Sequence, residues 1–410
     1  MPEPNNQTLL ILFLPQEWQT YHRRPYWEAL ARHTPVLVIE PPSGILTFWL
    51  HPKRMADYFR MLGKVRQNGD NLYFLRPLLI VPPGIDFRFP LFASIDRILM
   101  RRQVRNAVKS MHQESRSIVA FLVHVQQSLF SALIPGFRQC YEITDLYTLA
   151  IGEDKLDENN RYTRRALKEE KRIVEESHVV ITSSKLIYEG IRKSHPNIHY
   201  LRNSADYKHF SKSADTALKI PEEAAKLPRP RLGFIGYINN LIDFELLVRL
   251  SDEFSTGSVV LIGAEQKNTG ITGDIWFQKT KNKRNIHYLG FKDYENLPAY
   301  LKGFDICLMP FRLNEWMQHS APNKTYQYLA SGKPVVSTDF PEVRYLSDVI
   351  RIGKDHEDFV RQVREALSEK SDSLMAERKK IAAENSTENR AVRVMEIVNR
   401  AITLDKSNQA

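Results

Sequence analysis

One continuous segment constrains the fold more than any other part of the sequence. Between Phe304 and Val336 a buried strand, an irregular loop, a short helix and a second buried strand follow one another. Pro322 suits the first turn of the helix, Gly332 a left-handed residue after its end, and Pro334 prevents its continuation. The helix therefore begins where a parallel strand has just ended. At that edge of an open α/β sheet, free backbone N–H groups and the helix dipole favour a phosphate.

Two side chains of this helix extend the prediction. Lys324 adds a mobile positive charge in the first turn, and Gln327, one turn further on, is placed to meet the hydroxyls of an attached ribose. The segment is therefore predicted to hold a nucleotide diphosphate.

Composition narrows the class of protein. The 410 residues, 42% of them hydrophobic, suffice for two or three domains with real cores. No apolar run reaches the roughly 18 residues of a membrane span, and Leu9–Leu14 lacks the flanks of a signal peptide, so we expect a soluble, cytoplasmic protein. Cys140 and Cys307 lie in apolar runs, the pattern of buried thiols and not of a disulfide framework or metal site.

The formal net charge of +10 favours an acidic partner. Zinc-finger spacing, aromatic RNA-binding signatures and dense Lys/Arg blocks are missing from the sequence, so nucleic acid is only a minor alternative. A nucleotide or an anionic membrane surface therefore remains as the expected acidic partner.

Short apolar runs alternate with longer amphipathic stretches, which predicts parallel βαβ units. The strands expected in the first half are Leu9–Leu14, Val36–Ile39, Leu72–Leu75, Ile118–Val123, Gln139–Ile143, Val179–Thr182 and His199–Leu201. Those expected in the second half are Arg231–Ile235, Ser258–Ile262, Ile286–Tyr288, Asp305–Met309, Pro334–Ser337 and Val349–Ile352. We therefore predict an α/β protein with two Rossmann-like, doubly wound parallel-sheet domains that face a cleft.

The domain boundaries follow from composition. Residues 1–205 form the expected first domain, the polar and proline-containing residues 206–230 a linker, and residues 231–386 the second domain. After Ile352 only helical patterns remain, and we expect the last of them, 387–404, to return to the first domain.

A glycine turn closes the first strand of the second domain, within the sequence Gly233-Phe234-Ile235-Gly236-Tyr237. Glycine there lets the backbone approach a ligand, because no Cβ stands in the way. A tight strand-to-helix turn without a ligand is the alternative. The helix that follows is expected to open at Asn239 or Asn240.

Several longer segments resemble one enzyme family. They are GFIGYINNLIDFELL at 233–247, VVLIGA at 259–264, NIHYLGFKDYENLPAYLKGFDICLMPF at 285–311 and PNKTYQYLASGKPVVST at 322–338. In the first half the looser but collinear segments are RRPYWEALARH at 23–33, CYEITDLY at 140–147 and VVITSSKLIYEGIRKSHPNIHYLRNSADYKHF at 179–210. The chain thus resembles the retaining glycosyltransferases of family four, with two Rossmann domains (GT-B), especially bacterial enzymes of teichuronic acid and capsular or exopolysaccharide synthesis.

The resemblance implies transfer of a sugar from a nucleotide diphosphate sugar, as co-substrate, to an acceptor, with retention and without a bound metal or further cofactor. It implies that Lys324 holds the diphosphate, Gly236 admits it and Gln327 meets the ribose, in a donor site that also includes Tyr237, Pro310, His319 and Asn323. Across the cleft, the resemblance implies that His124 lies near the sugar and acceptor, and that Asp145 or Glu142 orients the acceptor. A satisfied structural histidine is the alternative for His124.

One departure from the family pattern concerns the donor site. Many members carry two glutamates eight positions apart, where this chain has His319 and Gln327. Glutamine keeps one acceptor oxygen but loses the charge, so donor affinity is expected to fall by about tenfold. A scaffold that has lost catalysis, or a partner subunit, is therefore an alternative. A nucleotide-sugar epimerase is another, although the two replacements remove the carboxylates it would need.

The loop after the first strand is aromatic and basic. Trp18, His22, Arg23 and Arg24 suit stacking on a sugar and pairing with an anionic acceptor. A solvated helix start is the alternative.

Two further stretches suit an anionic membrane surface, because apolar and aromatic residues stand beside basic ones. Ile45–Leu50 runs into His51-Pro52-Lys53-Arg54, and Phe87–Phe92 leads into a stretch that carries Arg97, Arg101, Arg102 and Arg105. Amphipathic helices over a core have a similar composition. If the membrane interpretation holds, the protein is peripheral on the inner face of the cell membrane and the acceptor is a lipid-linked glycan.

Overall fold

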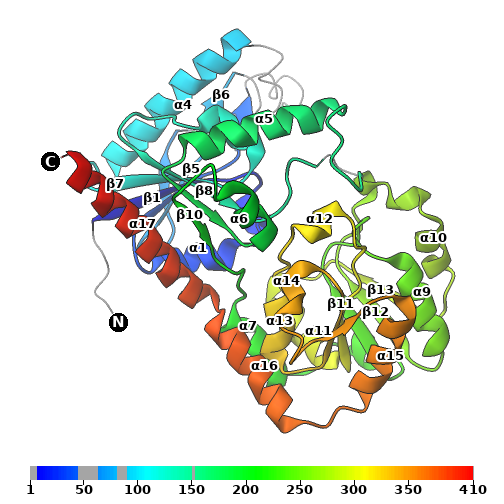
Figure 1. The fold of residues 1–410 in the computed structure, drawn as a ribbon. Coiled ribbons are helices and arrows are strands. Elements are labelled where there is room, and N and C mark those ends of the chain that lie inside the picture. The colour runs from blue at the N-terminus through cyan, green and yellow to red at the C-terminus, as the bar shows by residue number, and fades with distance from the viewer. Residues whose placement is uncertain (1–6, 45–62, 81–89, 150–152, 410) are drawn as a thin grey trace.

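The structure, a computed structural model, describes residues 7–44, 63–80, 90–149 and 153–409 (Figure 1). Two parallel sheets form the centres of two domains, and the longest C-terminal helix runs from the second domain back along the first. The stretches 45–54 and 87–89 of the membrane prediction lie outside the described residues.

The first domain is built on an eight-stranded sheet in the order β10-β9-β8-β7-β1-β2-β5-β4. Its strands are β1 Thr8–Phe13, β2 Val36–Ile39, β4 Val65–Gln67, β5 Leu72–Leu75, β7 Ser117–Leu122, β8 Arg138–Ile143, β9 Val179–Thr182 and β10 Ile198–Tyr200. All pairings are parallel except that of β4 with β5, an antiparallel edge that the sequence pattern did not predict. A separate small sheet pairs β3 Ser43–Gly44 with β6 Leu78–Leu79.

Helices cover both faces of this sheet, as expected for a doubly wound domain (Figure 1). They are α1 Arg24–Ala31, α4 Pro90–Ser110, α5 Arg161–Glu176 and α6 Lys185–Ile191, with short turns η1 Trp18–Thr20 and η4 Val125–Phe130. The last helix of the chain, α17 Thr387–Gln409, also belongs here, because Ala391, Val394 and Val398 lie in the same buried cluster as β1 and α1.

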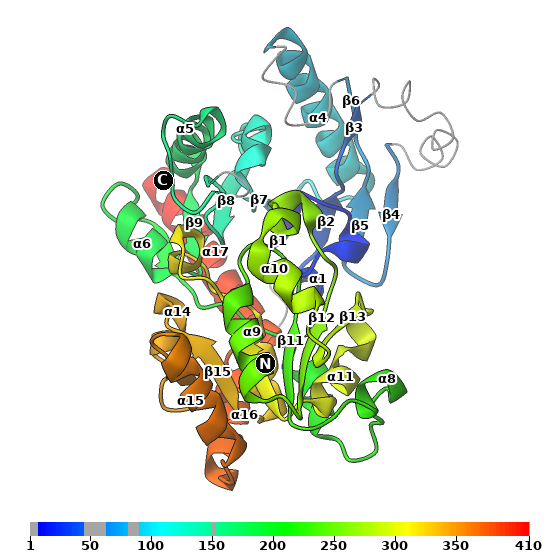
Figure 2. The same ribbon diagram turned by 90° about the vertical axis from the view of Figure 1, so that its right-hand side faces the viewer.

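The second domain is built on six parallel strands in the order β13-β12-β11-β14-β15-β16 (Figure 2). They are β11 Arg231–Ile235, β12 Ser258–Ile262, β13 Ile286–Gly290, β14 Ile306–Met309, β15 Val335–Thr338 and β16 Arg351–Gly353. The covering helices are α9 Phe244–Glu253, α10 Ile275–Lys281, α11 Leu297–Gly303, α12 Glu315–Gln318, α13 Lys324–Ser331, α14 Pro341–Arg344, α15 His356–Leu367 and α16 Asp372–Glu384. Short turns are η6 Lys267–Thr269, η7 Ile271–Gly273 and η8 Tyr294–Asn296.

Residues 206–230 differ from the linker that their composition predicted. They form α7 Tyr207–Phe210, η5 Ser211–Ala214 and α8 Glu222–Ala225, and Phe210 and Ala224 are buried in the core of the second domain. The apolar side chains among the polar ones explain the difference, because their burial holds the segment against the sheet.

Two helix starts also differ from prediction. The helix after β11 opens at Phe244, because Asp243 and not an asparagine accepts the capping hydrogen bond, from the backbone N–H of Leu246 at 3.0 Å. Asn239 instead closes a local turn onto Leu241 N. Helix α13 begins after its N-cap Asn323, so Pro322 precedes the first turn, while Gly332 ends the helix at φ +76° as expected.

Candidate donor site between the domains

Two glycine turns stack at the carboxyl edge of the second sheet, and the first of them lies against the side chain of Lys324. Gly236, directly after β11, has φ +152°, and a Cβ there would stand 2.2 Å from Lys324 Cε and 2.5 Å from its Nζ. Gly263, directly after β12, is equally confined, since its Cβ would stand 1.9 Å from Gly236 O. Only glycine therefore lets these turns stack and leaves room for the lysine above them.

Lys324 is a partly buried cation without an ionic partner among the described residues. Its Nζ lies 5.2 Å from the ring centroid of Phe234 and 5.7 Å from that of Phe311, within the range of cation–π attraction. Burial lowers the pKa of Lys324 to about 8, although the carboxylate of Asp145 acts in the opposite direction. A desolvated ammonium group at a helix N-terminus attracts an anion.

Two other residues predicted for the nucleotide-sugar site lie at the start of α13. Asn323 makes no capping hydrogen bond with its side chain, and its buried Oδ1 has no partner. Gln327 and Asn323 both line a small cavity at the domain junction, together with residues of the first domain. The structure thus brings Gly236, Lys324, Asn323 and Gln327 to one edge of the cleft.

Asp145 of the first domain reaches across to the second. Its Oδ1 accepts a hydrogen bond from Ser320 Oγ at 2.9 Å, and its Oδ2 accepts one from Tyr147 OH at 3.4 Å. Burial raises the pKa of Asp145 to about 6, while these hydrogen bonds and Arg23 lower it. The negative charge of Asp145 also raises the pKa of Lys324, against the effect of burial.

His124 caps the short helix η4. Its Nδ1 accepts the backbone N–H of Gln126 at 3.1 Å, and Gln127 Oε1 accepts the backbone N–H of His124. The ring packs 4.3 Å from that of Tyr147, and burial lowers the pKa of His124 to about 4. The histidine is therefore neutral with its proton on Nε2, so it can donate a hydrogen bond to a ligand oxygen but is not placed to accept a proton there.

The basic loop after β1 is less open than predicted. Trp18 is buried in the first-domain core against Phe74, because its indole fills space beneath β5, which differs from the expected stacking on a sugar. His22 is exposed to solvent on one side and lines the same small cavity as Asn323 and Gln327, and desolvation together with the charges of Arg23 and Lys324 lowers its pKa to about 4, so it is a neutral ring there.

The charges of Arg23 and Glu142 are largely satisfied within the protein. Arg23 Nη2 donates to Glu142 Oε1, and Arg390 Nη2 of α17 donates to the same oxygen at 2.7 Å. Glu142 is fully buried, and the two guanidinium groups lower its pKa. The position of Glu142 therefore differs from the acceptor contact predicted for it, since an acceptor cannot reach it.

The remaining predicted residues lie around this centre. Arg24, at the rim, pairs with Glu28 of its own helix and with Glu295 of the second domain. Tyr237 stands 47% exposed beside Gly236. The other two contact the protein itself, since Pro310 O accepts the N–H of Asp243 and His319 Nδ1 lies 2.9 Å from Glu315 O.

A second group of contacts joins the domains beside the site. Asp154 accepts hydrogen bonds from Arg312 at 2.9 Å, from Asn314 at 3.3 Å and from the backbone of Glu315. Glu315 Oε2 in turn accepts the backbone N–H of Leu156 at 2.6 Å. This bridge and the contacts of Ser320 and Arg390 could not be predicted from the sequence, because partners that are more than 150 residues apart form no recognisable spacing.

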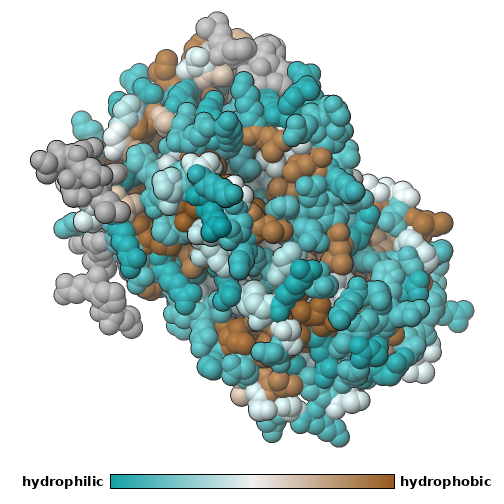
Figure 3. All heavy atoms as spheres, viewed as in Figure 1, coloured by the Kyte–Doolittle hydropathy of each residue, from teal (hydrophilic) through white to brown (hydrophobic). Residues whose placement is uncertain are grey.

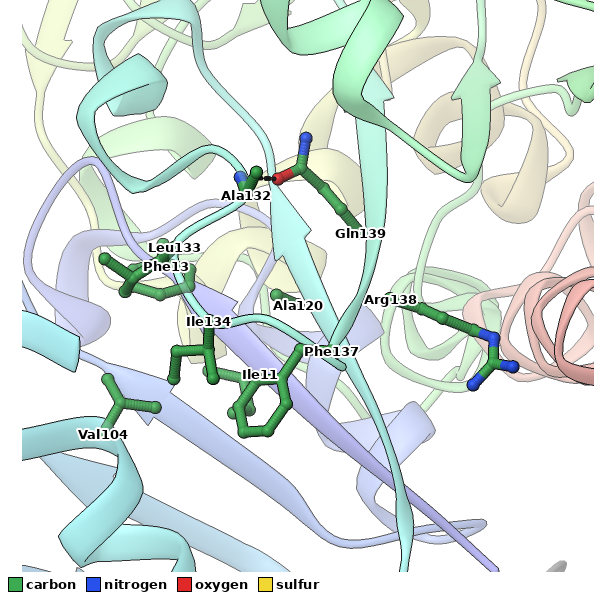
Figure 4. A pocket seen from close by; sticks show the side chains of 10 residues that line it. All are labelled: Ile11, Phe13, Val104, Ala120, Ala132, Leu133, Ile134, Phe137, Arg138 and Gln139. Atoms are coloured by element: carbon green, nitrogen blue, oxygen red, sulfur yellow. Dashed lines mark hydrogen bonds between the residues drawn. The ribbon is translucent and has the colours of Figure 1, made fainter. Parts of the chain in front are cut away.

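A different hollow in the first domain carries no comparable chemistry. It lies between α4 and the sheet and is lined mainly by apolar side chains (Figure 4). The polar exceptions are Gln139, whose Oε1 accepts Ala132 N at 2.7 Å, and Arg138, which points away toward α17 and donates to Ile402 O. It is part of the core packing.

The described residues contain no group of three or more His, Cys, Asp or Glu side chains that could hold a metal ion. Within the same ranges, no helix is both long and apolar enough to cross a bilayer. On the face shown in Figure 3 hydrophilic residues predominate, and hydrophobic ones gather only in small separate groups.

Part of the second domain matches a known protein family. Residues 229–369 match the family described as Glycosyl transferases group 1. The Bacillus subtilis (strain 168) protein TuaH, named for a teichuronic acid biosynthesis glycosyltransferase, is 27% identical over 221 residues, which are 52% of this chain and 53% of TuaH. The match therefore spans about half the length of that relative.

Solved structures resemble the whole chain in fold. Sucrose-phosphate synthase from Thermosynechococcus elongatus has a TM-score of 0.65 at 14% identity and covers 97% of this chain and 100% of its own. Anabaena HepE in complex with UDP and glucose has a TM-score of 0.61 at 10% identity, with 96% and 100% covered. WaaG, a glycosyltransferase involved in lipopolysaccharide biosynthesis, has a TM-score of 0.59 at 11% identity, with 95% and 99% covered.

Residues 229–369 of the second domain thus match the group 1 glycosyl transferase family, and the chain as a whole has the two-domain GT-B fold of these solved structures.

Proposed function

We propose that the protein is a retaining glycosyltransferase of the hexosyltransferase class. It would transfer a sugar from a nucleotide diphosphate sugar to a glycan or lipid-linked acceptor in surface polysaccharide biosynthesis. The observation that carries the proposal is Lys324: a partly buried cation without an ionic partner among the described residues, at a helix N-terminus and against the glycine turn at Gly236. The similarity to TuaH supports the polysaccharide setting.

In this proposal the second domain stabilises the leaving group. Negative charge develops on the diphosphate as the glycosidic bond breaks, and Lys324 together with the N-terminus of α13 opposes that charge without a bound metal. A dry site makes this interaction stronger than it would be in water. Gly236 gives the diphosphate room, and Tyr237 and Pro310 border the same edge.

The first domain orients the acceptor. Asp145 is ionised near pH 7 because its pKa lies at about 6, so it can accept a hydrogen bond from an acceptor hydroxyl. His124 can donate from Nε2 to an oxygen of the transferred sugar. The proton of the acceptor hydroxyl would pass to an oxygen of the departing diphosphate. The contacts between Asp154 and the segment before α13 would keep water out while the cleft is closed.

The proposal is tested by measuring thermal stability with UDP, GDP, ADP and CMP in turn. A nucleotide at one hundred times its dissociation constant stabilises the folded state by about 2.7 kcal/mol, a visible shift in melting temperature. We expect one nucleotide to give this shift and Lys324→Ala to lose it. Lys333→Ala is the matched control, since Lys333 follows the other end of α13 and donates to Phe304 O away from the site. No shift with any nucleotide would contradict the proposal and favour a catalytically inactive scaffold.

A peripheral membrane contact is a second part of the proposal. On α4, Arg97 and Arg101 donate to the backbone carbonyls of Leu129, Ala132 and Leu133, so they serve the fold. Arg102, Arg105 and Ile98, which is 64% exposed, face outward and suit an anionic lipid surface.

Co-sedimentation with vesicles of phosphatidylcholine and phosphatidylglycerol tests this contact. The double variant Arg102→Gln, Arg105→Gln should bind less than wild type, and the control Lys168→Gln, Lys171→Gln on α5 should bind equally well. Binding that did not depend on anionic lipid would count against a membrane contact.

A further inference from the structure

The domain junction contains a small polar cavity that the proposed mechanism does not use. It measures about 20 Å³, room for a water-sized group. Its lining comes from both domains: the start of α1 with Arg23 and Tyr26, the crossover around Asn203, and α13 with Asn323 and Gln327. The cavity therefore exists only while the two domains lie together.

Three polar atoms of this lining are buried and have no hydrogen-bond partner: Arg23 Nη1, Tyr26 OH and Asn323 Oδ1. Folded proteins satisfy nearly all of their buried polar groups, so three such atoms around one cavity need an explanation. One is a charged donor, one is an acceptor and one is a hydroxyl. A group that both accepts and donates hydrogen bonds would satisfy them.

The orientation of Arg23 is fixed by its neighbours. Its Nη2 donates to Glu142 Oε1, and its guanidinium carbon lies 4.8 Å from the ring centroid of Tyr26. Its side chain is only 4% exposed. Arg390 uses the same carboxylate oxygen and approaches the same ring at 5.5 Å, but does not line the cavity. Arg23 Nη1 is thus a hydrogen-bond donor that is held in place and has no partner within the protein.

The cavity lies about one helical turn from the proposed phosphate site. Lys324 and Gln327 are three residues apart on α13, so their side chains are neighbours with Cβ atoms about 5–6 Å apart. His22, which directly precedes Arg23, lines the cavity together with Asn323 and Gln327, so the loop of Arg23 lies against the same end of α13. A ligand that bridges the two positions carries an anion at one end and a hydroxyl group a few ångströms away, as a nucleoside diphosphate does.

We propose that this cavity is a hydroxyl subsite of the donor, and that Arg23 of the first domain is a donor-binding residue that fixes specificity for a ligand hydroxyl. The ligand oxygen accepts from Arg23 Nη1, and its proton is donated to Asn323 Oδ1. The inference rests on the proposed function. The hydroxyl comes from the ribose or from the transferred sugar. Because Arg23 and Asn323 belong to different domains, the donor is held fully only when the cleft closes.

Arg23→Lys tests the subsite, since lysine keeps the charge beside Glu142 but lacks the second nitrogen. Arg390→Lys is the matched control in the same buried cluster. Both are titrated by calorimetry with UDP, GDP and ADP, with their 2′-deoxy and 3′-deoxy forms, and with UDP-glucose, GDP-mannose and ADP-glucose. For the nucleotide that binds, wild type should prefer the ribose form over one deoxy form by roughly tenfold, and Arg23→Lys should lose this preference. Arg390→Lys should keep it.

The possible outcomes distinguish the two sources of the hydroxyl group. They also distinguish failure of the subsite from failure of the proposed function. An effect of Arg23→Lys confined to the nucleotide sugar would assign the hydroxyl to the transferred sugar. Equal weakening of every ligand, or no weakening, would overturn the subsite and leave the cavity to a bound water. If Arg23→Lys does not fold, Asn323→Ala must abolish the same preference. If the wild-type protein binds none of the nucleotides, the proposed function is overturned, and so is the subsite.

Discussion

The two domains form the two walls of the cleft, and they differ in how their charged side chains are paired. In the second domain Lys324 is partly buried beside aromatic rings, with no carboxylate paired to it among the described residues. In the first domain Arg23 and Arg390 are more deeply buried, and Glu142 lies between them. Since an unpaired buried charge is costly, the second wall is prepared for an anion that arrives from outside. The first wall has most of its charge balanced from within.

Each domain also holds one of the two C-terminal helices by a buried arginine. Arg378 of α16 pairs with Glu369 and donates to Val349 O in the second domain. Arg390 of α17 pairs with Glu142 and donates to Leu201 O and Arg202 O in the first. The second-domain pair is local in sequence, whereas the first-domain pair closes a separation of 248 residues. The first domain therefore depends on the return of the chain from the second.

The largest expected effect concerns this dependence. Glu142→Gln removes the carboxylate that two buried guanidinium groups share, so we expect the free energy of unfolding to fall by about 3–5 kcal/mol. Glu369→Gln strands a single buried arginine and should cost less. Urea unfolding followed by circular dichroism measures both. A loss below about 1 kcal/mol for Glu142→Gln would show that water reaches the cluster and that the first wall is not dry.

The next effect tests how tightly the second wall is built. Gly236→Ala places a methyl group against Lys324 Cε, at a φ that disfavours a side chain, so the ammonium group must move. We expect nucleotide affinity to fall by about tenfold or more, because phosphate contacts depend on geometry. Gly190→Ala is the control, since a Cβ at that helical position meets nothing within 4 Å. Unchanged affinity in Gly236→Ala would mean that the diphosphate does not lie over this turn.

A pH series separates the lysine from its surroundings. The pKa of Lys324 lies at about 8 in the free protein, and a bound diphosphate should raise it, so binding above pH 8 takes up a proton. Nucleotide affinity should therefore fall as pH rises through 8, by up to about tenfold per pH unit, until the pKa of the complex is reached. Calorimetry in buffers of different ionisation enthalpy measures the proton uptake. Lys324→Arg should bind with little pH dependence, and the same slope in that variant would assign it elsewhere.

The difference between the walls also explains what could be predicted from sequence. In the second domain the candidate site is marked by local sequence features: Gly236 follows β11, Gly332 ends α13, and Lys324 is the first residue of that helix. These features lie within a strand, a turn and a helix, so the pattern predicted them, and strands such as β11 and β12 have the bounds expected for them.

The first wall could not be predicted in the same way. Nothing in the spacing of Arg23, Glu142 and Arg390 shows that they meet, because the start of α1, the strand β8 and the returning helix α17 bring them together. The sequence therefore predicted that Glu142 orients the acceptor and that Trp18 stacks on a sugar, whereas both side chains are buried in the structure. Sequence patterns show which side chains carry charge, but burial decides whether that charge is still available to a ligand.

The smallest effect lies where the walls touch, at the hydrogen bond from Ser320 to Asp145. That bond lowers the pKa of Asp145, which burial raises to about 6. Ser320→Ala should therefore move the pKa upward, so that at pH 6 fewer molecules carry the ionised carboxylate and turnover falls by about twofold to threefold, with little change at pH 8. Ser320→Thr keeps the hydroxyl and should restore the acid limb of the pH profile. If Ser320→Ala lowered activity equally at every pH, the bond would join the domains without tuning Asp145, and the two walls would be coupled by position alone.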